Sequence, residues 1–350
     1  MRRSSHKEDS IMKKLKFSVI GIQHGHIYGM CADLIKAGGE LVSAYDKDEA
    51  ARAEFAKRYP DVKIASSENE ILEDQSVSLV TGAAITSERA DIGIRVMKSG
   101  KDYFVDKGPF TTLSQLEEVK KVIAETGRKY MVCYSERLQS EASELAGIYL
   151  KEGRIGKVLQ YIGMGPHRLS APARPEWFFK KEQYGGIISD ICSHQFEQFL
   201  YFTGETDAKV NFARVSNYAH PEYPEFEDFG EVSLTGVGGT SGYMKVDWFT
   251  PDGLASWGDV RCFIIGTDGF MELRKNLDIT GAKPGGDHIF ITTNGKPTEY
   301  INATGKIGHP FFEAFIDDCI NRTENAMTQA HCLKAAELTL LAQDFADKNK

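Results

Sequence analysis

The sequence predicts an α/β protein with two domains. Up to about residue 135, short apolar runs alternate with amphipathic stretches of helical length, which is typical of a doubly wound parallel sheet with helices on both faces. Beyond that point, alternating runs are joined by short glycine-containing turns, which indicates an α+β domain with a large, mostly antiparallel open sheet. The chain of 350 residues also exceeds what one hydrophobic core usually serves. We therefore expect domains at 13–135 and 136–350.

Each expected element follows from its periodicity and its breakers. In the first domain, strands are expected at 16–21, 41–46, 77–82, 102–106 and 129–133, and helices at 27–37, 48–59, 87–99 and 114–126. In the second domain, strands are expected at 210–219, 231–237, 241–249, 260–266 and 288–293, and helices at 187–202, 311–321 and 330–347.

Composition and charge exclude several classes of function. The formal net charge of −8 gives no footprint for nucleic acid, and no apolar run approaches the length of a membrane span. Residues 1–12 are polar, without the apolar core of a signal peptide, and are expected to be a disordered extension. The six cysteines are scattered and form no C-x-x-C pair, so we expect reduced thiols in a cytoplasmic protein.

A glycine turn follows the first expected strand. The segment 21–29 reads Gly-Ile-Gln-His-Gly-His-Ile-Tyr-Gly, which departs from G-x-G-x-x-G because Gln23 and His26 replace the second and third glycines. Its position between a strand and a helix predicts that free backbone N–H groups bind a pyrophosphate. The predicted nucleotide-binding residues of this loop are Gly21, Gln23, His24, Gly25, His26 and Ile27.

An acidic residue, Asp46, ends the second expected strand. It lies 25 residues beyond Gly21, where a carboxylate would hold a ribose 2′-hydroxyl and repel a 2′-phosphate. The predicted cofactor is therefore NAD, with NADP less favoured. His24 and His26 are also a conceivable metal pair, but two histidines on a turn without an expected acidic or thiol partner are a poor metal signature. We expect no metal there.

Two further motifs resemble a known family. Val105-Asp106-Lys107-Gly108-Pro109 ends a strand of the first domain, and Gly185-Gly186-Ile187-Ile188-Ser189-Asp190-Ile191-Cys192-Ser193-His194 opens a helix of the second. Together they resemble the glucose–fructose oxidoreductase/inositol dehydrogenase (Gfo/Idh/MocA) family, with its Glu-Lys-Pro and Gly-Gly-x-x-x-Asp-x-x-x-His motifs. The resemblance implies an N-terminal Rossmann domain and runs from about residue 14 to the C-terminus.

The same resemblance implies roles for individual residues. Lys107, Asp190 and His194 match the family's catalytic lysine, aspartate and histidine, with His194 as the acid/base. Lys107 also borders the nicotinamide pocket, together with Ala84 and Thr86, which stand where the family has Thr-Pro-Asn. The sequence departs from the family at Asp106, which replaces glutamate, and at Gly108, which displaces the proline to position 109.

The chemistry of these residues also follows from their positions. Asp190 and His194 are four residues apart and would share one helix face, so the carboxylate is expected to raise the imidazole's affinity for a proton. A histidine that titrates near neutrality can take the hydroxyl proton of an alcohol. Lys107, at the C-terminal edge of the parallel sheet, can stabilise alkoxide character. Candidate substrate contacts are Arg137, His167, Arg174, Trp177 and Tyr184.

These observations favour an NAD-dependent oxidoreductase that acts on a secondary hydroxyl of a sugar, an inositol or a related polyol. Two alternatives stay open: an enzyme that cleaves glycosides by transient oxidation and elimination, and a non-catalytic, sugar-responsive regulator. The resemblance implies a homodimer or homotetramer formed through the C-terminal sheet. No nucleic-acid or membrane partner is expected.

Overall fold

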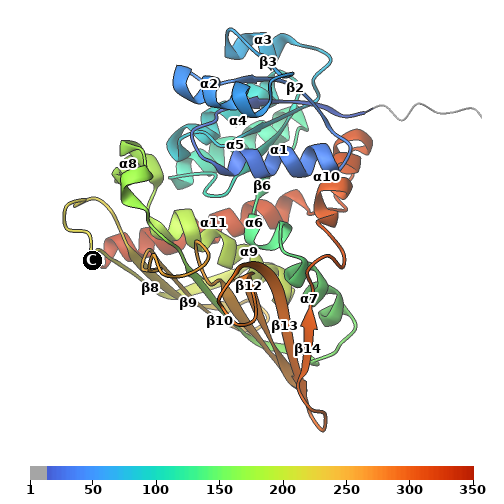
Figure 1. Ribbon diagram of the computed structural model, residues 1–350, viewed down its shortest axis with the longest axis vertical. Coiled ribbons are helices and arrows are strands. Elements are labelled where there is room, and N and C mark those ends of the chain that lie inside the picture. Colours follow the sequence, from blue (N-terminus) through green and yellow to red (C-terminus); the bar gives the residue numbers. More distant parts are fainter. Residues whose placement is uncertain (1–13) are drawn as a thin grey trace, which may run out of the picture.

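The computed structural model describes residues 14–350, so the expected extension at 1–12 lies outside the described residues. A six-stranded parallel sheet forms the first domain, with strand order β3-β2-β1-β4-β5-β6 and helices on both faces (Figure 1). Its strands are β1 (Lys16–Ile20), β2 (Glu40–Tyr45), β3 (Lys63–Ile64), β4 (Leu79–Gly82), β5 (Asp102–Asp106) and β6 (Tyr130–Cys133). Its helices are α1 (His26–Lys36), α2 (Glu49–Arg58), α3 (Glu68–Glu73), α4 (Arg89–Lys98) and α5 (Leu113–Thr126), with a 3₁₀ turn at Thr86–Glu88.

This strand order fixes where a ligand can bind. The chain leaves β1 toward β2 on one side and continues from β4 toward β6 on the other, so the order reverses between β1 and β4. Ligands of open α/β sheets bind outside the carboxyl ends of the strands at such a switch point. The loops after β1, β4 and β5 meet there.

An eight-stranded sheet forms the second domain, with strand order β14-β13-β12-β11-β7-β10-β9-β8. Of the strand pairs described in this sheet, only β7 with β10 is parallel. The strands are β7 (Val158–Pro166), β8 (Ala208–Ser216), β9 (Phe229–Gly236), β10 (Ser241–Asp247), β11 (Arg261–Gly266), β12 (Gly269–Leu277), β13 (Pro284–Thr293) and β14 (Glu299–Asn302). The predicted fold class is confirmed.

Helices α9 (Ser193–Thr203) and α11 (Gln329–Lys348) contact β7 and β8 respectively and lie between this sheet and the first domain (Figure 1). The remaining helical elements are α6 (Ser135–Leu138), α7 (Glu141–Lys151), α8 (Lys181–Tyr184) and α10 (Pro310–Asn321), 3₁₀ turns at Ala171–Ala173 and Glu176–Phe179, and a π-helical turn at Ile188–Cys192.

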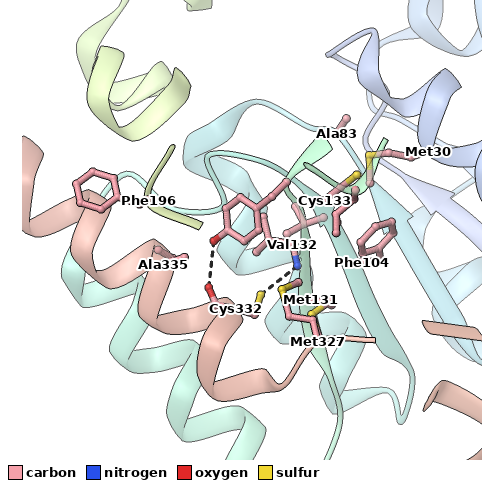
Figure 2. Packing of buried hydrophobic residues seen from close by; sticks show 14 of the residues in the cluster. Met30, Ala83, Phe104, Met131, Val132, Cys133, Phe196, Met327, Cys332 and Ala335 are labelled. Atoms are coloured by element: carbon pink, nitrogen blue, oxygen red, sulfur yellow. Dashed lines mark hydrogen bonds between the residues drawn. The ribbon is translucent and has the colours of Figure 1, made fainter. Parts of the chain in front are cut away.

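The C-terminal helices join the two domains. Figure 2 shows α11 against β6, where the Val132 N–H lies 3.3 Å from the Cys332 sulfur and the Tyr134 hydroxyl donates to the Cys332 carbonyl at 3.0 Å. In α10, Phe311 and Phe315 pack on Phe104 of β5, with the Phe104 and Phe315 ring centroids 4.9 Å apart. The sheet edge that carries the predicted site is thus held against the second domain by buried apolar surface, which resists separation of the domains.

Four strands were absent from the sequence prediction: β3, β7, β12 and β14. β3 has only two residues, and β7 carries two glycines that weaken its strand pattern. A side chain at one of these, Gly163, would lie 2.3 Å from the amide oxygen of Gln195, so α9 occupies the space that a strand residue would fill. Tertiary packing selected glycine there, against local strand preference.

All six cysteines are buried and unpaired, as predicted. Among residues 14–350, no helix combines the length and the hydropathy required to cross a lipid bilayer.

Candidate active site

The loop between β1 and α1 has the shape of a nucleotide-binding turn. Gly21 has φ of +91°, and a Cβ there would lie 2.5 Å from the Ala84 Cβ, so this position requires glycine. The Ile22 and His24 N–H groups bond to Asp46 and to the Ala83 carbonyl. Within the described chain, the N–H groups of Gln23 and Gly25 donate no hydrogen bond. These two donors, at the start of α1, are available for an anion.

A pocket of about 280 Å³ lies beside this loop and is lined by Gly21, Tyr45, Asp46 and Ala84, among others. The Asp46 carboxylate accepts bonds from the Ile22 N–H at 2.6 Å and from the Gln23 side-chain amide at 2.9 Å. Asp46 thus shapes the loop as well as bordering the pocket. The charged groups lining the pocket comprise four carboxylates and two cations: Asp46, Glu68, Glu88, Asp91, Lys47 and Arg95.

Lys47 pairs with Glu88, and Arg95 pairs with Glu68, whereas Asp46 and Asp91 form no ion pair within residues 14–350. An adenosine with free ribose hydroxyls fits this pocket electrostatically, whereas a 2′-phosphate would meet like charge.

Of the ten predicted cofactor residues, Gly21, Asp46 and Ala84 line this pocket, and two of the other seven are turned into the protein interior. Ile27 is fully buried on the core side of α1, and its N–H already bonds to the His24 carbonyl. Thr86 is 3% exposed and lies next to Gly108. Helical periodicity explains the first case, because the second residue of an amphipathic helix can turn inward while its neighbour faces the ligand.

Lys107 follows β5 and reaches across to the second domain. Its ammonium forms an ion pair with the Asp190 carboxylate, and the two residues are 3% and 7% exposed. Gly108, which displaces the proline of the family motif, has φ of +70°, and a Cβ there would lie 3.3 Å from the Ser189 carbonyl oxygen. The inserted glycine allows the chain to turn against the second domain while Lys107 still reaches Asp190.

Arg89 holds this corner of the chain and had no predicted role. Its guanidinium donates to the carbonyl oxygens of Ala84 at 2.8 Å, of Lys107 and of Gly108 at 3.3 Å, and it pairs with Asp106 at 3.2 Å. Arg89 is 1% exposed. Five donors in a planar fork suit this convergence of carbonyls, which lysine could not satisfy. In the sequence, the only hint of this role is that Arg89 follows the strand that ends at Gly82 by seven residues.

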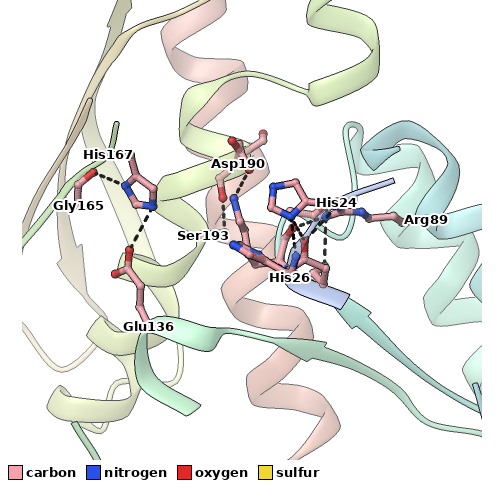
Figure 3. A network of polar contacts seen from close by, with 12 residues as sticks. His24, His26, Arg89, Glu136, Gly165, His167, Asp190 and Ser193 are labelled. Carbon is pink, nitrogen blue, oxygen red and sulfur yellow. Dashed lines mark hydrogen bonds and ion pairs between the residues drawn. The ribbon is translucent and has the colours of Figure 1, made fainter. Parts of the chain in front are cut away.

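Asp106 contacts His24, His26 and Arg89, the three residues labelled at one side of Figure 3. The His26 Nδ1 is 2.9 Å from one carboxylate oxygen and the His24 Nδ1 is 3.4 Å from the other. Burial would raise the pKa of Asp106, but the charges of His26 and Arg89 outweigh it and hold that pKa well below its usual range. Burial, then His26, lowers the pKa of His24.

The expectation that the two histidines lack an acidic neighbour is therefore wrong, since the topology brings the end of β5 to the loop after β1. Three ligand atoms, one each from His24, His26 and Asp106, lie within 4.8 Å of one another. The guanidinium of Arg89 also binds this carboxylate, and Lys107 adjoins it. The fixed charge of Arg89 disfavours a metal cation there; the Lys107 contact is a backbone N–H, and its ammonium pairs with Asp190.

The segment that carries Asp190 and His194 is not a plain α-helix. Residues 188–192 form a π-helical turn, a feature frequent at functional sites, and α9 begins at Ser193. Asp190 faces Lys107 and has one carboxylate oxygen without a partner, and the buried His194 has a Nδ1 without a partner within residues 14–350. The predicted Asp190–His194 pair is replaced by a Lys107–Asp190 pair.

The environment of His194 consequently differs from the prediction. Burial, followed by the positive charge of Lys107, lowers the pKa of His194 well below its ordinary value. The sequence argument assumed that Asp190 would raise this pKa. Burial and the Lys107 charge thus favour the neutral imidazole, which has a lone pair that can accept a proton.

A cavity of about 510 Å³ opens in front of His194. It lies between the domains, since His26 of the first domain and Glu136, His167 and Arg174 of the second line it. Burial, then the charge of Lys107, lowers the pKa of His167 to about 3, and burial raises the pKa of Glu136. The structure thus places two of the five predicted substrate contacts, His167 and Arg174, in the cavity wall.

The other three predicted contacts do not line this cavity. Arg137 is buried in ion pairs with Glu197 at 2.6 Å and Glu144 at 2.7 Å. Tyr184 donates from its hydroxyl to the Glu225 carbonyl at 3.3 Å and packs near Phe178. Trp177 is 8% exposed and packs on Phe178 too. An aromatic cluster that reads as a binding wall in sequence is here a structural core.

Sequence reasoning missed several residues that do line the cavity. Trp257 is 42% exposed, and its ring lies 4.5 Å from that of His167. Glu136 and Lys275 face the same space, and the Lys275 ammonium donates to the Gln198 amide oxygen at 3.1 Å. A buried lysine in β12 is detectable only once the strand alternation is known, because that strand was not predicted.

Comparison with known proteins places these features in a family. Residues 15–134 match the oxidoreductase family with an NAD-binding Rossmann fold, and residues 147–272 match the GFO/IDH/MocA C-terminal domain. The chain belongs to the Gfo/Idh/MocA family. The predicted family is therefore confirmed, and with it the assignment of the first domain as an NAD-binding Rossmann domain.

Three relatives are similar over different lengths. A crystal structure from Erwinia carotovora atroseptica SCRI1043, described as an oxidoreductase, is 46% identical with a TM-score of 0.92 and covers 95% of this chain and 99% of its own. The scyllo-inositol 2-dehydrogenase (NAD(+)) of Bacillus subtilis (strain 168) is 26% identical over 66% of this chain and 65% of its own. A levoglucosan dehydrogenase of Pseudarthrobacter phenanthrenivorans is 28% identical over 45% of this chain and 40% of its own. This chain therefore spans less than two thirds of either curated relative.

Proposed function

We propose that this protein is an NAD-dependent dehydrogenase that oxidises a secondary hydroxyl of a sugar, an inositol or a related polyol, or catalyses the reverse reduction. The observation that most supports this function is the Lys107–Asp190 ion pair beside neutral His194. This group lies at the switch point of the parallel sheet, where His194 borders a cavity of about 510 Å³. The family and the names of the two curated relatives support this assignment.

The chain's own residues supply binding and proton chemistry. Lys107 uses one N–H on Asp190 and retains two donors, which can bond the reacting oxygen and stabilise alkoxide character. His194 accepts the hydroxyl proton. Its depressed pKa makes it a weaker base than an ordinary histidine, so stabilisation by Lys107 carries a larger share of catalysis.

The nucleotide is held by the loop after β1 and the acidic pocket beside it. Gln23 and Gly25 offer N–H groups to the pyrophosphate, and Asp46 offers a carboxylate to the ribose. When bound, NAD supplies the hydride acceptor for the alcohol carbon. The excess of negative charge around Asp46 and Asp91 supports NAD over NADP.

A fully assembled catalytic corner disfavours the regulator alternative, because buried charges that served no chemistry would cost stability. The glycoside-cleaving alternative uses the same corner and differs in its net products. Net accumulation of NADH distinguishes the dehydrogenase from that scheme, in which the hydride returns to the substrate.

The outer face of the large sheet supports a homodimer or homotetramer. Tyr243, Ile162 and Phe263 form a row across β10, β7 and β11, and each is half-buried while its strand neighbours are buried on the inner face. An apolar row on an open sheet face is suited to association with a second subunit. Light scattering should show an oligomer that Ile162→Glu dissociates, and a monomeric wild type would contradict this assembly.

His194→Ala tests the proposed activity. NADH formation from a neutral polyol should fall about 10²-fold, the lower end of the range for loss of a general base, because the depressed pKa of His194 makes it a weak base. NAD affinity, measured by calorimetry, should stay within a few-fold of wild type. Undiminished turnover by the variant would refute the role of His194.

A further inference from the structure

Two hydrogen-bond acceptors face each other in the cavity wall away from the lysine corner. The His167 Nδ1 lies 3.1 Å from the Gly165 carbonyl oxygen, which can only accept, so Nδ1 carries the ring proton (Figure 3). The His167 Nε2 is therefore an acceptor in the neutral ring. It lies 4.0 Å from the Glu136 Oε1, too far for a hydrogen bond.

The neighbours of Glu136 fix which of its oxygens is free. The Glu136 Oε2 accepts from the side-chain amides of Gln195 at 2.6 Å and Gln198 at 3.3 Å. Both amides are oriented by other donors, since the Tyr161 hydroxyl bonds to the Gln195 oxygen at 2.8 Å and the Lys275 ammonium to the Gln198 oxygen. Their NH₂ groups must therefore point to Oε2.

The remaining oxygen, Oε1, is buried and has no partner within the described chain. The Glu136 side chain is 5% exposed, and the residue lines the same cavity as His194. A second buried acceptor without a partner, the Asn276 side-chain oxygen, belongs to another residue of this lining. Buried polar atoms are rarely left unbonded, so this wall has a deficit of donors that a ligand can meet.

We propose that Glu136 and His167 form a subsite for a substrate hydroxyl other than the one that reacts, with that hydroxyl donating to the Glu136 Oε1. The subsite rests on the proposed function for the position of the reacting hydroxyl at His194. At this position it favours a hydroxyl over a carboxylate or phosphate, because either anion would bring a further acceptor and a negative charge toward Glu136. The half-exposed Trp257 ring beside His167 provides an apolar platform for the C–H face of such a ligand.

Glu136→Gln tests this subsite sharply. The Gln195 and Gln198 amides require an acceptor, so they should orient the new side chain with its oxygen toward them and its NH₂ toward the His167 Nε2. The substitution therefore puts a donor where the free acceptor was, so a substrate hydroxyl can no longer donate at this position. The thermal midpoint of the ligand-free variant should be equal to or above that of wild type.

Binding is measured by calorimetry with the NADH-loaded protein and three probes: scyllo-inositol, levoglucosan and D-glucuronate. Wild type should bind at least one neutral probe more tightly than D-glucuronate, and Glu136→Gln should weaken that binding about 10- to 100-fold, as for a lost bond to a charged group. The exposed-carboxylate control Glu118→Gln should bind as wild type does. If Glu136→Gln does not fold, His167→Gln serves, since its amide can donate to the Glu136 Oε1 and should weaken binding equally.

Equal affinity of Glu136→Gln and wild type, tighter binding of D-glucuronate, or binding of neither neutral probe would each overturn the subsite. The two proposals fail separately. Binding that depends on Glu136 without any NADH formation would refute the dehydrogenase and retain the subsite. If Glu136→Gln forms NADH at the wild-type rate, the subsite is refuted and the dehydrogenase is retained.

Discussion

The cavity and the lysine corner beside it have one wall from each domain, and the two walls differ in how completely their polar groups are bonded. On the first-domain wall, the Asp106 carboxylate bonds to the Lys107 N–H, His26 and Arg89, and Lys107 pairs with Asp190. On the second-domain wall, the Glu136 Oε1, the Asp190 Oδ2, the His194 Nδ1 and the Asn276 Oδ1 are buried without partners in the described chain. We infer that the first wall is assembled in advance and that a ligand completes the second. This division is what a preorganised catalytic corner facing a substrate surface requires.

Removal of the lysine at the junction of the two walls should have the largest effect. Lys107→Met removes the donor to the reacting oxygen and leaves Asp190 unpaired, so kcat/KM should fall about 10²- to 10³-fold. Steady-state NADH formation measures it. The exposed Lys98→Met, on α4, is the control and should retain wild-type rates; equal rates for the two variants would show that Lys107 does not contact the reacting oxygen.

The bonded wall should also be the more fragile one. Arg89→Met leaves the Asp106 carboxylate and four carbonyls without their guanidinium, and loss of one partner from a buried pair costs about 3–5 kcal/mol of unfolding free energy. Arg95→Met, on the same helix, breaks only the exposed pair with Glu68 and should cost less than about 1 kcal/mol. Urea unfolding compares the two, and similar losses would contradict the assigned role of Arg89.

Acid should weaken the second wall through its buried histidine. The pKa of His167 is about 3 in the folded protein and about 6.5 in an unfolded chain, so the unfolded state binds the extra proton between these values. Stability present above pH 6.5 is lost as the pH falls toward 3. The slope attributable to His167 is at most about 1.4 kcal/mol per pH unit. When the free energy of unfolding is plotted against pH, the slope for His167→Gln should be smaller than that of wild type by this amount. Equal slopes for the two proteins would exclude a buried neutral His167.

The smallest expected change concerns the choice of cofactor. Asp46→Ser removes the carboxylate that repels a 2′-phosphate, so the ratio of NAD to NADP affinity should fall about 10-fold, equivalent to roughly 1.4 kcal/mol. Because Asp46 also holds the Ile22 N–H, absolute NAD affinity should fall as well. Calorimetric titration with both nucleotides measures the ratio, and an unchanged ratio would assign Asp46 to loop structure alone.

Much of the fold could be predicted from sequence, because strand and helix periodicities in the first domain are strong and local. Gly21 and Asp46 were found in the same way, since a glycine turn and an acidic strand end have fixed spacing. The π-helical turn before His194 could not be found, because it lacks a distinctive residue pattern. The pairing of Lys107 with Asp190 depends on how two domains dock.

Dependence on tertiary contacts also explains why three of the five predicted substrate contacts do not line the cavity. Arg137 and Tyr184 are polar residues in plausible positions, but Glu197 and Glu225, remote in sequence, bind them into the core. Glu136 and Trp257 carry no motif and face the cavity only through tertiary packing. Motifs located Lys107 and Asp190, but not their pairing or the contacts of Arg89, His24 and His26 with Asp106. The unbonded wall became visible only from atoms that lack partners in the described chain.

The most direct test of the central claim is to incubate the purified protein with NAD and scyllo-inositol or levoglucosan, and to follow NADH and polyol oxidation together. Hydride transfer at this cavity predicts that NADH accumulates in equal amount to the ketone formed, in wild type and not in Lys107→Met. Tight NAD binding without NADH accumulation from any neutral polyol or sugar would contradict it.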